Sequence, residues 1–401
     1  MLGAYILLGA WLGVAVLYWL YALYASVQTV RKVPRLCNVE ATPPTSWPRL
    51  SVVVAARNEE DSIATAMQSL LEQDYPNLQI VLVDDRSEDR TGEIIDDLAG
   101  RDARVAAVHL RDLPAGWLGK VHALQRGLEA CDGTYVLFTD ADVHFSGDVL
   151  RRAVAWCERD RLDLLAALPG LWPTGGLLTA MIATFLRQLN MRMRFWAVGD
   201  PRSKAYMGVG AFNLVRREAL DRTPGFEWLR LEIGDDAGLG LMVKRSGGRC
   251  VICNARQYLG LHWYSTIAQM MRGMEKGFAP IADCRLWRAA MTLVMLLALE
   301  WAPPAALLGG AVWAALGGGA WAWAMLGGGT VMVGCAVAGT AGAGQWAGIP
   351  LRALLYWPAS VLVMAAGMVR MTVMGLRRGG VQWRDTFYTC RELRQNRRVK
   401  L

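Results

Sequence analysis

The chain has 401 residues, of which 54% are hydrophobic, and a formal net charge of +8. This length is enough for two or three domains, and the hydrophobic share argues against a wholly soluble protein. The positive charge suits anionic lipid head groups and a nucleotide substrate, whereas no patterned basic and aromatic stripe indicates a nucleic-acid partner.

Near the N-terminus, residues 2–30 contain no charged side chain. A helix of that length can cross the hydrocarbon core of a bilayer. Because the stretch lacks a basic leading region and a clear small-residue cleavage site, we interpret residues 1–30 as an uncleaved transmembrane anchor. Arg31, Lys32 and Arg35 follow directly, so the positive-inside rule places the next domain in the cytoplasm.

Residues 48–285 are predicted to form this cytoplasmic domain, in which apolar runs of strand length alternate with helical segments. The strand candidates are residues 50–56, 78–83, 104–110 and 134–139, and the helix candidates are residues 57–71, 90–99 and 120–130. Continuous apolar runs are typical of strands buried on both faces of a parallel sheet. The alternation predicts an α/β fold with a Rossmann-like, mostly parallel sheet. No G-x-G-x-x-G motif follows the first strand, which disfavours dinucleotide binding.

Acidic groups follow three of these strands: the segment 58–60, the pair Asp84 and Asp85, and the pair Asp140 and Asp142. The carboxyl ends of parallel strands share one edge, where ligands bind, so we expect these groups to converge. The alternative for each is capping of the following helix. Two acids two residues apart suit a hard divalent cation that also touches phosphates. Asp140 and Asp142 are therefore the predicted metal ligands.

Several motifs in this order resemble family 2 glycosyltransferases of the GT-A fold, from about residue 51 to residue 277. They are the Arg-Asn-Glu-Glu turn at 57–60, Val-Asp-Asp-Arg-Ser at 83–87, Gly-Lys-x-x-Ala-Leu at 119–124 and Phe-Thr-Asp-Ala-Asp at 138–142. The resemblance implies that the first turn lies against the base, that the second reads the base and ribose, and that Mg²⁺ or Mn²⁺ holds the diphosphate. The nucleotide-sugar ligands it implies are Ala56, Arg57, Asn58, Glu59, Asp84, Asp85, Lys120 and Asp140.

Two later segments extend the resemblance. Gly208 and Gly210 precede an Arg-Arg-Glu-Ala-Leu helix start, and glycine lets the backbone approach a ligand closely; an ordinary turn is the alternative. Asp235 and Asp236 resemble the family's Glu-Asp-x-x-Leu motif, with aspartate where glutamate is usual. The resemblance implies that Asp236 is the catalytic base of an inverting transfer. Paired acids raise each other's pKa, which would help such a base near neutrality.

Two basic segments remain open to more than one interpretation. Arg272 and Lys276, four residues apart, share a helix face and can clamp the diphosphate or face lipid head groups. Residues 177–198 mix arginines with Met, Phe and Trp. For this segment we favour an amphipathic helix in the bilayer surface over a helix buried on the sheet. The Gln-x-x-Arg-Trp motif of many membrane relatives is absent from residues 261–277, which disfavours a processive polysaccharide synthase.

Residues 289–376 are predicted to form a C-terminal membrane region, because Glu300, Arg352 and Arg370 are its only charged residues. The basic tail, residues 377–401, is expected in the cytoplasm. Three simple spans would place that tail outside. A first segment that lies in the interface, or folds back at Pro303 and Pro304, removes this conflict.

These observations predict an integral protein of the cytoplasmic membrane that moves one sugar from a nucleotide sugar, a UDP-sugar, to a lipid on the cytoplasmic face. Residues 113–120 resemble transferases associated with hopanoid and carotenoid glycolipids and, more distantly, ceramide glucosyltransferases. The alternatives are a processive polysaccharide synthase and a catalytically silent scaffold of the same fold. The intact Asp142 and Asp236 argue against the scaffold.

Overall fold

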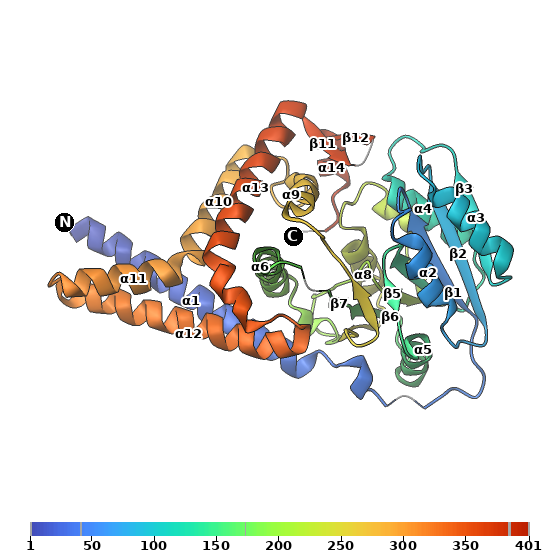
Figure 1. The fold of residues 1–401 in the computed structure, drawn as a ribbon, viewed down its shortest axis with the longest axis horizontal. Coiled ribbons are helices and arrows are strands. Elements are labelled where there is room, and N and C mark those ends of the chain that lie inside the picture. The colour runs from blue at the N-terminus through green and yellow to red at the C-terminus, as the bar shows by residue number, and fades with distance from the viewer. Residues whose placement is uncertain (1, 41, 173, 384–385, 400–401) are drawn as a thin grey trace.

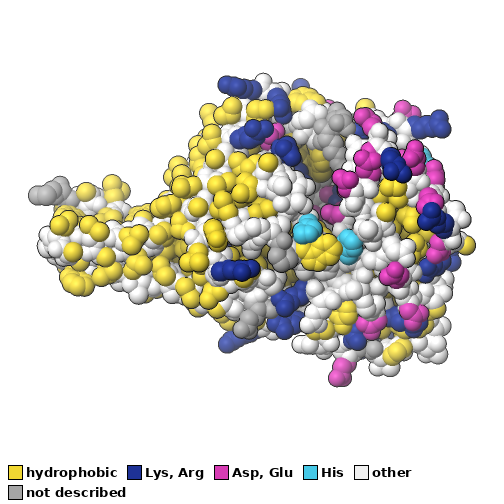
Figure 2. Space-filling model, viewed as in Figure 1, with side chains coloured by type: hydrophobic (Ala, Val, Ile, Leu, Met, Phe, Trp, Pro, Cys, Tyr) yellow, Lys and Arg dark blue, Asp and Glu magenta, His cyan; other side chains and the backbone are white. Residues whose placement is uncertain are grey.

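An α/β domain and a helical arm make up the computed structural model, which describes residues 2–40, 42–172, 174–383 and 386–399. Figure 1 shows the domain at one end and a helical arm projecting from it. The arm is formed by helices α1 (Leu2–Lys32), α11 (Ala302–Ala315) and α12 (Gly319–Ala347). Apolar side chains cover the arm, whereas acidic side chains gather on the domain (Figure 2). This division fits a protein that stands partly in a membrane.

The domain is built on a seven-stranded sheet with the strand order β3-β2-β1-β4-β8-β6-β9. Strand β8 is antiparallel to both of its neighbours, and every other adjacent pair is parallel. The predicted mostly parallel sheet is confirmed. Its strands are β1 (Leu50–Ala56), β2 (Leu78–Asp85), β3 (Val105–Leu110), β4 (Tyr135–Asp140), β6 (Leu164–Leu168), β8 (Asn213–Arg216) and β9 (Cys250–Asn254).

The helices of the domain follow the predicted alternation, with one difference at the first. Helix α2 begins at Ile63 rather than at residue 57, because Asn58 takes a left-handed φ of 52° that a helix does not tolerate. The other helices are α3 (Thr91–Arg101), α4 (Gly119–Glu129), α5 (Val149–Asp160), α7 (Arg217–Asp221) and α8 (Asp235–Arg245). A small second sheet, which the sequence did not predict, comprises β5 (His144–Phe145), β10 (Leu259–Leu261) and β7 (Gly170–Leu171).

Three stretches are long and apolar enough to cross a membrane: Leu2–Lys32, Gly319–Gly344 and Leu351–Arg378. They belong to α1 (Leu2–Lys32), α12 (Gly319–Ala347) and α13 (Trp357–Arg378), the last preceded by a 3₁₀ turn at Leu351–Tyr356. Helices α10 (Leu286–Glu300) and α11 (Ala302–Ala315) form a bent pair, with 50° between them. The bend falls just before Pro303 and Pro304, which interrupt the helix begun by α10 but are tolerated in the first turn of α11. The expected break at the prolines is confirmed.

The C-terminal tail folds back onto the α/β domain. It forms β11 (Gly380–Trp383), β12 (Thr386–Thr389) and α14 (Cys390–Asn396). The backbone N–H of Val399 donates to Glu232 Oε2 at 2.8 Å, and the Tyr388 hydroxyl donates to the Trp117 carbonyl at 3.1 Å. The tail therefore packs against the α/β domain, and its expected place in the cytoplasm stays a prediction.

Helix α6 (Gly176–Met193) lies between the domain and the membrane helices (Figure 1). It packs against α1, α13 and the turn before α13. Of the two interpretations of this segment, burial against the central sheet is not what the structure shows. Helix α9 (Ile267–Glu275) packs against α13 nearby.

Candidate active site

The three acidic segments meet at one edge of the sheet, as predicted. Asp84 is the β2 partner of Ala56 at the end of β1, and Asp140 is the β4 partner of Ala55. The carboxyl ends of β1, β2 and β4 are therefore level with one another. This edge is where open α/β sheets bind ligands.

The turn after β1 is fastened to the loop after β2. The Asn58 backbone N–H donates to Ser87 Oγ at 3.1 Å, and the Glu88 N–H donates to Asn58 Oδ1 at 2.9 Å. The Glu59 N–H donates to Thr91 Oγ1 at 2.8 Å. These bonds fix the two loops to each other, and Arg57 in the first loop is buried. The two loops therefore form one wall of the sheet edge.

Asp84 and Asp85 are both buried and point to opposite sides of β2, as successive strand residues do. Asp84 contacts His109 Nδ1 of β3 at 3.2 Å and lies close to Gly92 in the first turn of α3. Asp85 accepts from Arg86 Nε at 2.8 Å and lies so close to Gly119 that a Cβ there would overlap its carboxylate. The pair thus reaches the starts of two different helices.

Lys120, in the first turn of α4, links the middle of the sheet edge to α8. Its Nζ lies 2.7 Å from Asp140 Oδ1 and 3.4 Å from Asp235 Oδ2. Burial lowers the pKa of Lys120, but the negative charges of Asp140, Asp235 and Asp236 outweigh burial and raise it above its ordinary value. Lys120 therefore carries a permanent positive charge among these acids.

Asp236 lies against the glycine segment that precedes β8. Its Oδ2 accepts from the Gly210 N–H at 3.1 Å, and its Oδ1 accepts from the Ala237 N–H at 2.7 Å. A Cβ on Gly208 would overlap the Asp236 carbonyl, and a Cβ on Gly210 would lie 2.6 Å from Asp140 Oδ2. Only glycine fits between the two acids. Burial, followed by the charge of Asp235, raises the pKa of Asp236 to about 6.

The chemistry of Asp140 and Asp142 fits a divalent cation. Burial, followed by the charges of Asp140 and Glu59, raises the pKa of Asp142 to about 7. A cation would offset this negative charge. Among the described residues, no group of three or more His, Cys, Asp or Glu side chains is placed to hold a metal. Mg²⁺ is commonly bound by one or two carboxylates, and water and substrate phosphates complete its coordination shell.

Lys276, one of the two predicted basic residues after β10, has a pKa that responds to the charges of the site acids. Helix α9 ends at Glu275, and Lys276 begins a 3₁₀ turn (Lys276–Phe278). Desolvation of the ammonium group, followed by the charge of Lys120, lowers the pKa of Lys276. The charges of Asp235 and the other site acids act in the opposite direction. Its Nζ also lies 5.1 Å from the centre of the Trp383 ring. Arg272 is exposed on α9, and no ion pair joins it to an acid within the described chain.

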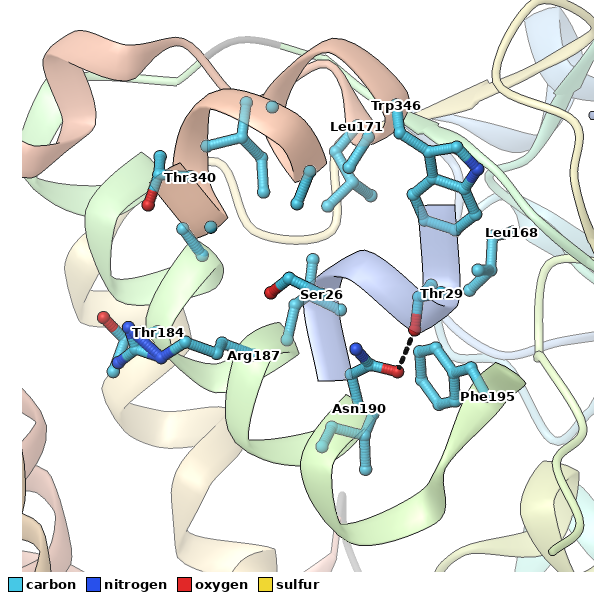
Figure 3. Close-up of a pocket in the computed structure, with 18 of the residues that line it drawn as sticks. Ser26, Thr29, Leu168, Leu171, Thr184, Arg187, Asn190, Phe195, Thr340 and Trp346 are labelled. Atoms are coloured by element: carbon cyan, nitrogen blue, oxygen red, sulfur yellow. Dashed lines mark hydrogen bonds between the residues drawn. The ribbon is translucent and has the colours of Figure 1, made fainter. Parts of the chain in front are cut away.

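A cavity of about 280 Å³ opens from this site toward the membrane helices (Figure 3). Asp140 and Asp236 line one part of it, and side chains of α1, α6 and α12, together with Trp357 of α13 and loops of the domain, line the rest. Sequence reasoning missed the cavity, although polar residues inside apolar helices were a visible signal. The polar and charged members from the helices are Ser26, Thr29, Thr184, Arg187, Asn190 and Thr340.

Glu300 forms a second charged cluster at the membrane side of this cavity. It is almost fully buried and pairs with Arg187, which lines the cavity. The Tyr18 hydroxyl donates to Glu300 Oε1 at 2.5 Å, and Gln188 Nε2 donates to the same oxygen at 3.2 Å. Arg187 therefore faces the protein interior, where sequence reasoning had grouped it with arginines of an interfacial helix.

Comparison with known proteins identifies the domain. Residues 51–223 match the family described as Glycosyl transferase family 2. The chain carries a family 2 glycosyltransferase domain. With the strand order given above, this domain has a GT-A-like α/β fold.

Named relatives match parts of the chain. A beta-monoglucosyldiacylglycerol synthase of Synechocystis is 31% identical over 230 residues, 55% of this chain and 45% of the relative. One from Trichormus variabilis is 30% identical over 203 residues, 48% of this chain and 41% of the relative. The chain thus spans less than half the length of these curated relatives. A solved mannosyltransferase from Pyrobaculum calidifontis, in complex with GDP-Man and Mn²⁺, is 18% identical with a TM-score of 0.49, covering 91% of this chain and 99% of that one.

Proposed function

We propose that this family 2 glycosyltransferase moves one sugar from a UDP-sugar to a lipid acceptor at the cytoplasmic face of the membrane, with inversion at the anomeric carbon. The cavity carries this proposal, because it joins Asp140 and Asp236 to the membrane helices α1, α12 and α13. A lipid can thus reach the acids without leaving an apolar environment. The names of the relatives from Synechocystis and Trichormus variabilis agree with a lipid acceptor.

The donor is assigned to the sheet edge above β1, β2 and β4. The fastened turns at 57–60 and 86–91 form the wall for the base, and Asp84 and Asp85 provide acceptors for base and ribose. Lys120 and Lys276 are the cations for the diphosphate. Asp140 and Asp142 would hold Mg²⁺ or Mn²⁺, which when bound offsets the charge of the leaving diphosphate.

The transfer requires a base on the acceptor side of the sugar. The acceptor hydroxyl oxygen forms a bond to the anomeric carbon while the bond from that carbon to the diphosphate oxygen breaks. The hydroxyl proton passes to an Asp236 carboxylate oxygen. The pKa of about 6 suits this role, because the group is largely ionised at neutral pH yet basic enough to take a proton. Asp235 holds the Lys120 ammonium group in place, and its negative charge helps raise the pKa of Asp236.

The apolar lining supports a single transfer rather than polymer synthesis. A growing polysaccharide would need a continuous polar channel through the membrane helices. The cavity is lined instead mainly by Ala, Leu, Gly and Trp side chains, among them Trp19, Ala336 and Trp357. Such a surface accommodates hydrocarbon.

The experiment is to incubate the purified full-length protein with radiolabelled sugar nucleotides and total membrane lipid. We expect one labelled sugar per lipid in the organic phase, with the highest rate from a UDP-sugar. The Asp236→Asn variant, folded and able to bind nucleotide, serves as the control and should give no labelled lipid. Label in a water-soluble polymer would identify a polysaccharide synthase, and nucleotide binding without any transfer would identify a silent scaffold.

The cytoplasmic orientation of the domain is part of the proposal and rests on Arg31, Lys32 and Arg35 after the first span. Cys37, partly exposed just beyond them, offers a natural label. A membrane-impermeant maleimide should modify Cys37 in lysed cells and not in intact ones. Modification in intact cells would show that the domain lies on the outer side of the membrane.

A further inference from the structure

Two polar side chains in the cavity have hydrogen-bonding capacity that the protein leaves unused. Ser26 of α1 and Asn190 of α6 line the cavity, and each is only 9% exposed. The Thr29 hydroxyl donates to Asn190 Oδ1 at 2.9 Å, which occupies the oxygen of the amide. Figure 3 shows the amide nitrogen turned away from Thr29, toward the open middle of the cavity where Ser26 also lies. Within the described chain, neither this nitrogen nor the Ser26 hydroxyl has a protein partner.

Other polar groups of the cavity differ in this respect, and within the described chain Trp346 Nε1 and Arg187 Nε also lack a hydrogen-bond partner. Asn254 also lines the cavity, but its Nδ2 donates to the Trp346 carbonyl at 2.6 Å. Hydroxyls inside helices usually bond back to the preceding turn. Thr330 and Thr372 in this chain do so, each at 2.8 Å. Within the described chain Ser26 makes no such bond, and neither do Thr184 and Thr340, which also line the cavity. The Ser26 hydroxyl is therefore available to a molecule in the cavity, and it lies beside the Asn190 amide (Figure 3).

We infer that Ser26 and Asn190 form a subsite for a neutral oxygen acceptor on the lipid, an ester or amide carbonyl close to the hydroxyl that receives the sugar. This inference rests on the proposed function and specifies its acceptor. Both groups open into the cavity, and a carbonyl oxygen there can accept from the Asn190 N–H and from the Ser26 O–H.

The charge of the cavity argues for a neutral group rather than a phosphate. Arg187 is the cation from the helices that lines the cavity, and its charge is already paired with Glu300. A phosphate at Ser26 and Asn190 would lack a free positive charge, which phosphate recognition normally uses. The acceptor is therefore an uncharged acylated lipid, with its hydroxyl at Asp236 and its chains along the apolar wall of α12.

The test compares two acceptors with identical chains and one free hydroxyl, joined through ester bonds in one and ether bonds in the other. The full-length protein should use the ester lipid with a kcat/KM about tenfold higher, the factor expected from one added hydrogen bond. Asn190→Leu and Ser26→Ala should lower that ratio toward one while the rate with the ether lipid stays unchanged. Thr330→Val, which removes an exposed hydroxyl already bonded within its helix, should keep the ratio of the unaltered protein.

Binding without donor gives a second readout. The ester lipid should raise the thermal midpoint of the unaltered protein more than the ether lipid does, and Asn190→Leu should remove this difference. Equal use of both lipids by the unaltered protein, or equal losses with both lipids in a folded Ser26→Ala variant, would overturn the subsite. Transfer to neither lipid would overturn the proposed function itself, and with it this inference.

Discussion

Two ion pairs lie at opposite ends of the cavity, and they differ in how far they are exposed. At the sheet edge, Lys120 and Asp140 keep 29% and 38% of their side chains exposed. At the membrane side, the exposed fractions are 17% for Arg187 and 1% for Glu300. The first pair can exchange partners with an incoming ligand, whereas the second is enclosed by α1, α6, α10 and α13.

The balance of charge also differs between the two ends. At the sheet edge Asp140, Asp142, Asp235 and Asp236 outnumber Lys120 and the more distant Lys276, and the pKa values of Asp142 and Asp236 are raised. Glu300, in contrast, has one cation and further donors from Tyr18, Gln188 and Trp357. Unbalanced charge prepares a site for a cation and a substrate, whereas a buried carboxylate paired with a cation from another helix holds the helices together. Substitutions at the two ends should therefore affect different quantities.

The largest expected effect is on catalysis at the sheet edge. Asp236→Asn keeps the shape of the side chain but removes the base, so the rate of sugar transfer should fall about 10²- to 10⁴-fold. Nucleotide affinity should change little, because Asp236 lies on the acceptor side. Radiolabel transfer and isothermal titration with UDP measure the two quantities. A variant that retains transfer would remove Asp236 from the role of base.

Removal of divalent cations should act at the same end of the cavity. Excess chelator is expected to stop transfer, and added Mg²⁺ or Mn²⁺ to restore it, because Asp140 and Asp142 cannot neutralise the diphosphate themselves. The thermal midpoint without donor should change little, since the metal requires substrate phosphates to complete its coordination. Full activity in excess chelator would contradict the assignment of these two acids.

Glu300→Gln tests the Glu300–Arg187 cluster at the membrane side of the cavity. The substitution leaves the buried Arg187 without a counter-charge, which typically costs about 3–5 kcal/mol of stability. Thermal unfolding in detergent should show a large decrease, with transfer lost only in proportion to the unfolded fraction. Glu227→Gln is a matched control, because the Glu227 side chain is 75% exposed and its ion pair with Arg230 is 4.0 Å long. That control should cost less than about 1 kcal/mol.

The two ends of the cavity also differ in how well the sequence predicted them. Strands β1, β2 and β4 are continuous apolar runs with acids at their ends, so local pattern was enough to place the sheet edge. Strand β8 escaped prediction, since Asn213–Arg216 is four residues long and its antiparallel pairing depends on distant partners. Short strands such as β5 and β7 carry no periodic signal at all.

The membrane end depended on packing between helices far apart in the chain. Glu300 was visible as a lone charge in an apolar region, but its partner Arg187 lies 113 residues earlier. Ser26 and Asn190 likewise become a pair only when α1 packs beside α6. The residue types showed that these apolar helices carry a few polar side chains. It did not show which residues would face one another.

The smallest expected effect concerns proton exchange at the sheet edge, which the enclosed Glu300 cluster should not show. His109 contacts Asp84 at 3.2 Å and Asp96 at 2.8 Å. Partial burial lowers the pKa of His109, but the hydrogen bonds to Asp96 and Asp84 outweigh burial and hold it above the ordinary value. The protonated ring is thus bound more tightly in the folded state than in the unfolded state.

It follows that His109 contributes stability that is fully present below its unfolded pKa of about 6.5 and lost as pH rises through the higher folded pKa. Thermal midpoints of the unaltered protein should fall slightly more between about pH 6 and pH 8 than those of His109→Gln. His262→Gln controls for loss of a histidine elsewhere. Parallel curves for His109→Gln and the unaltered protein would show that Asp84 is held by the turn at Ser87 rather than by the ring, because the Ser87 N–H also donates to Asp84 Oδ1, at 3.0 Å.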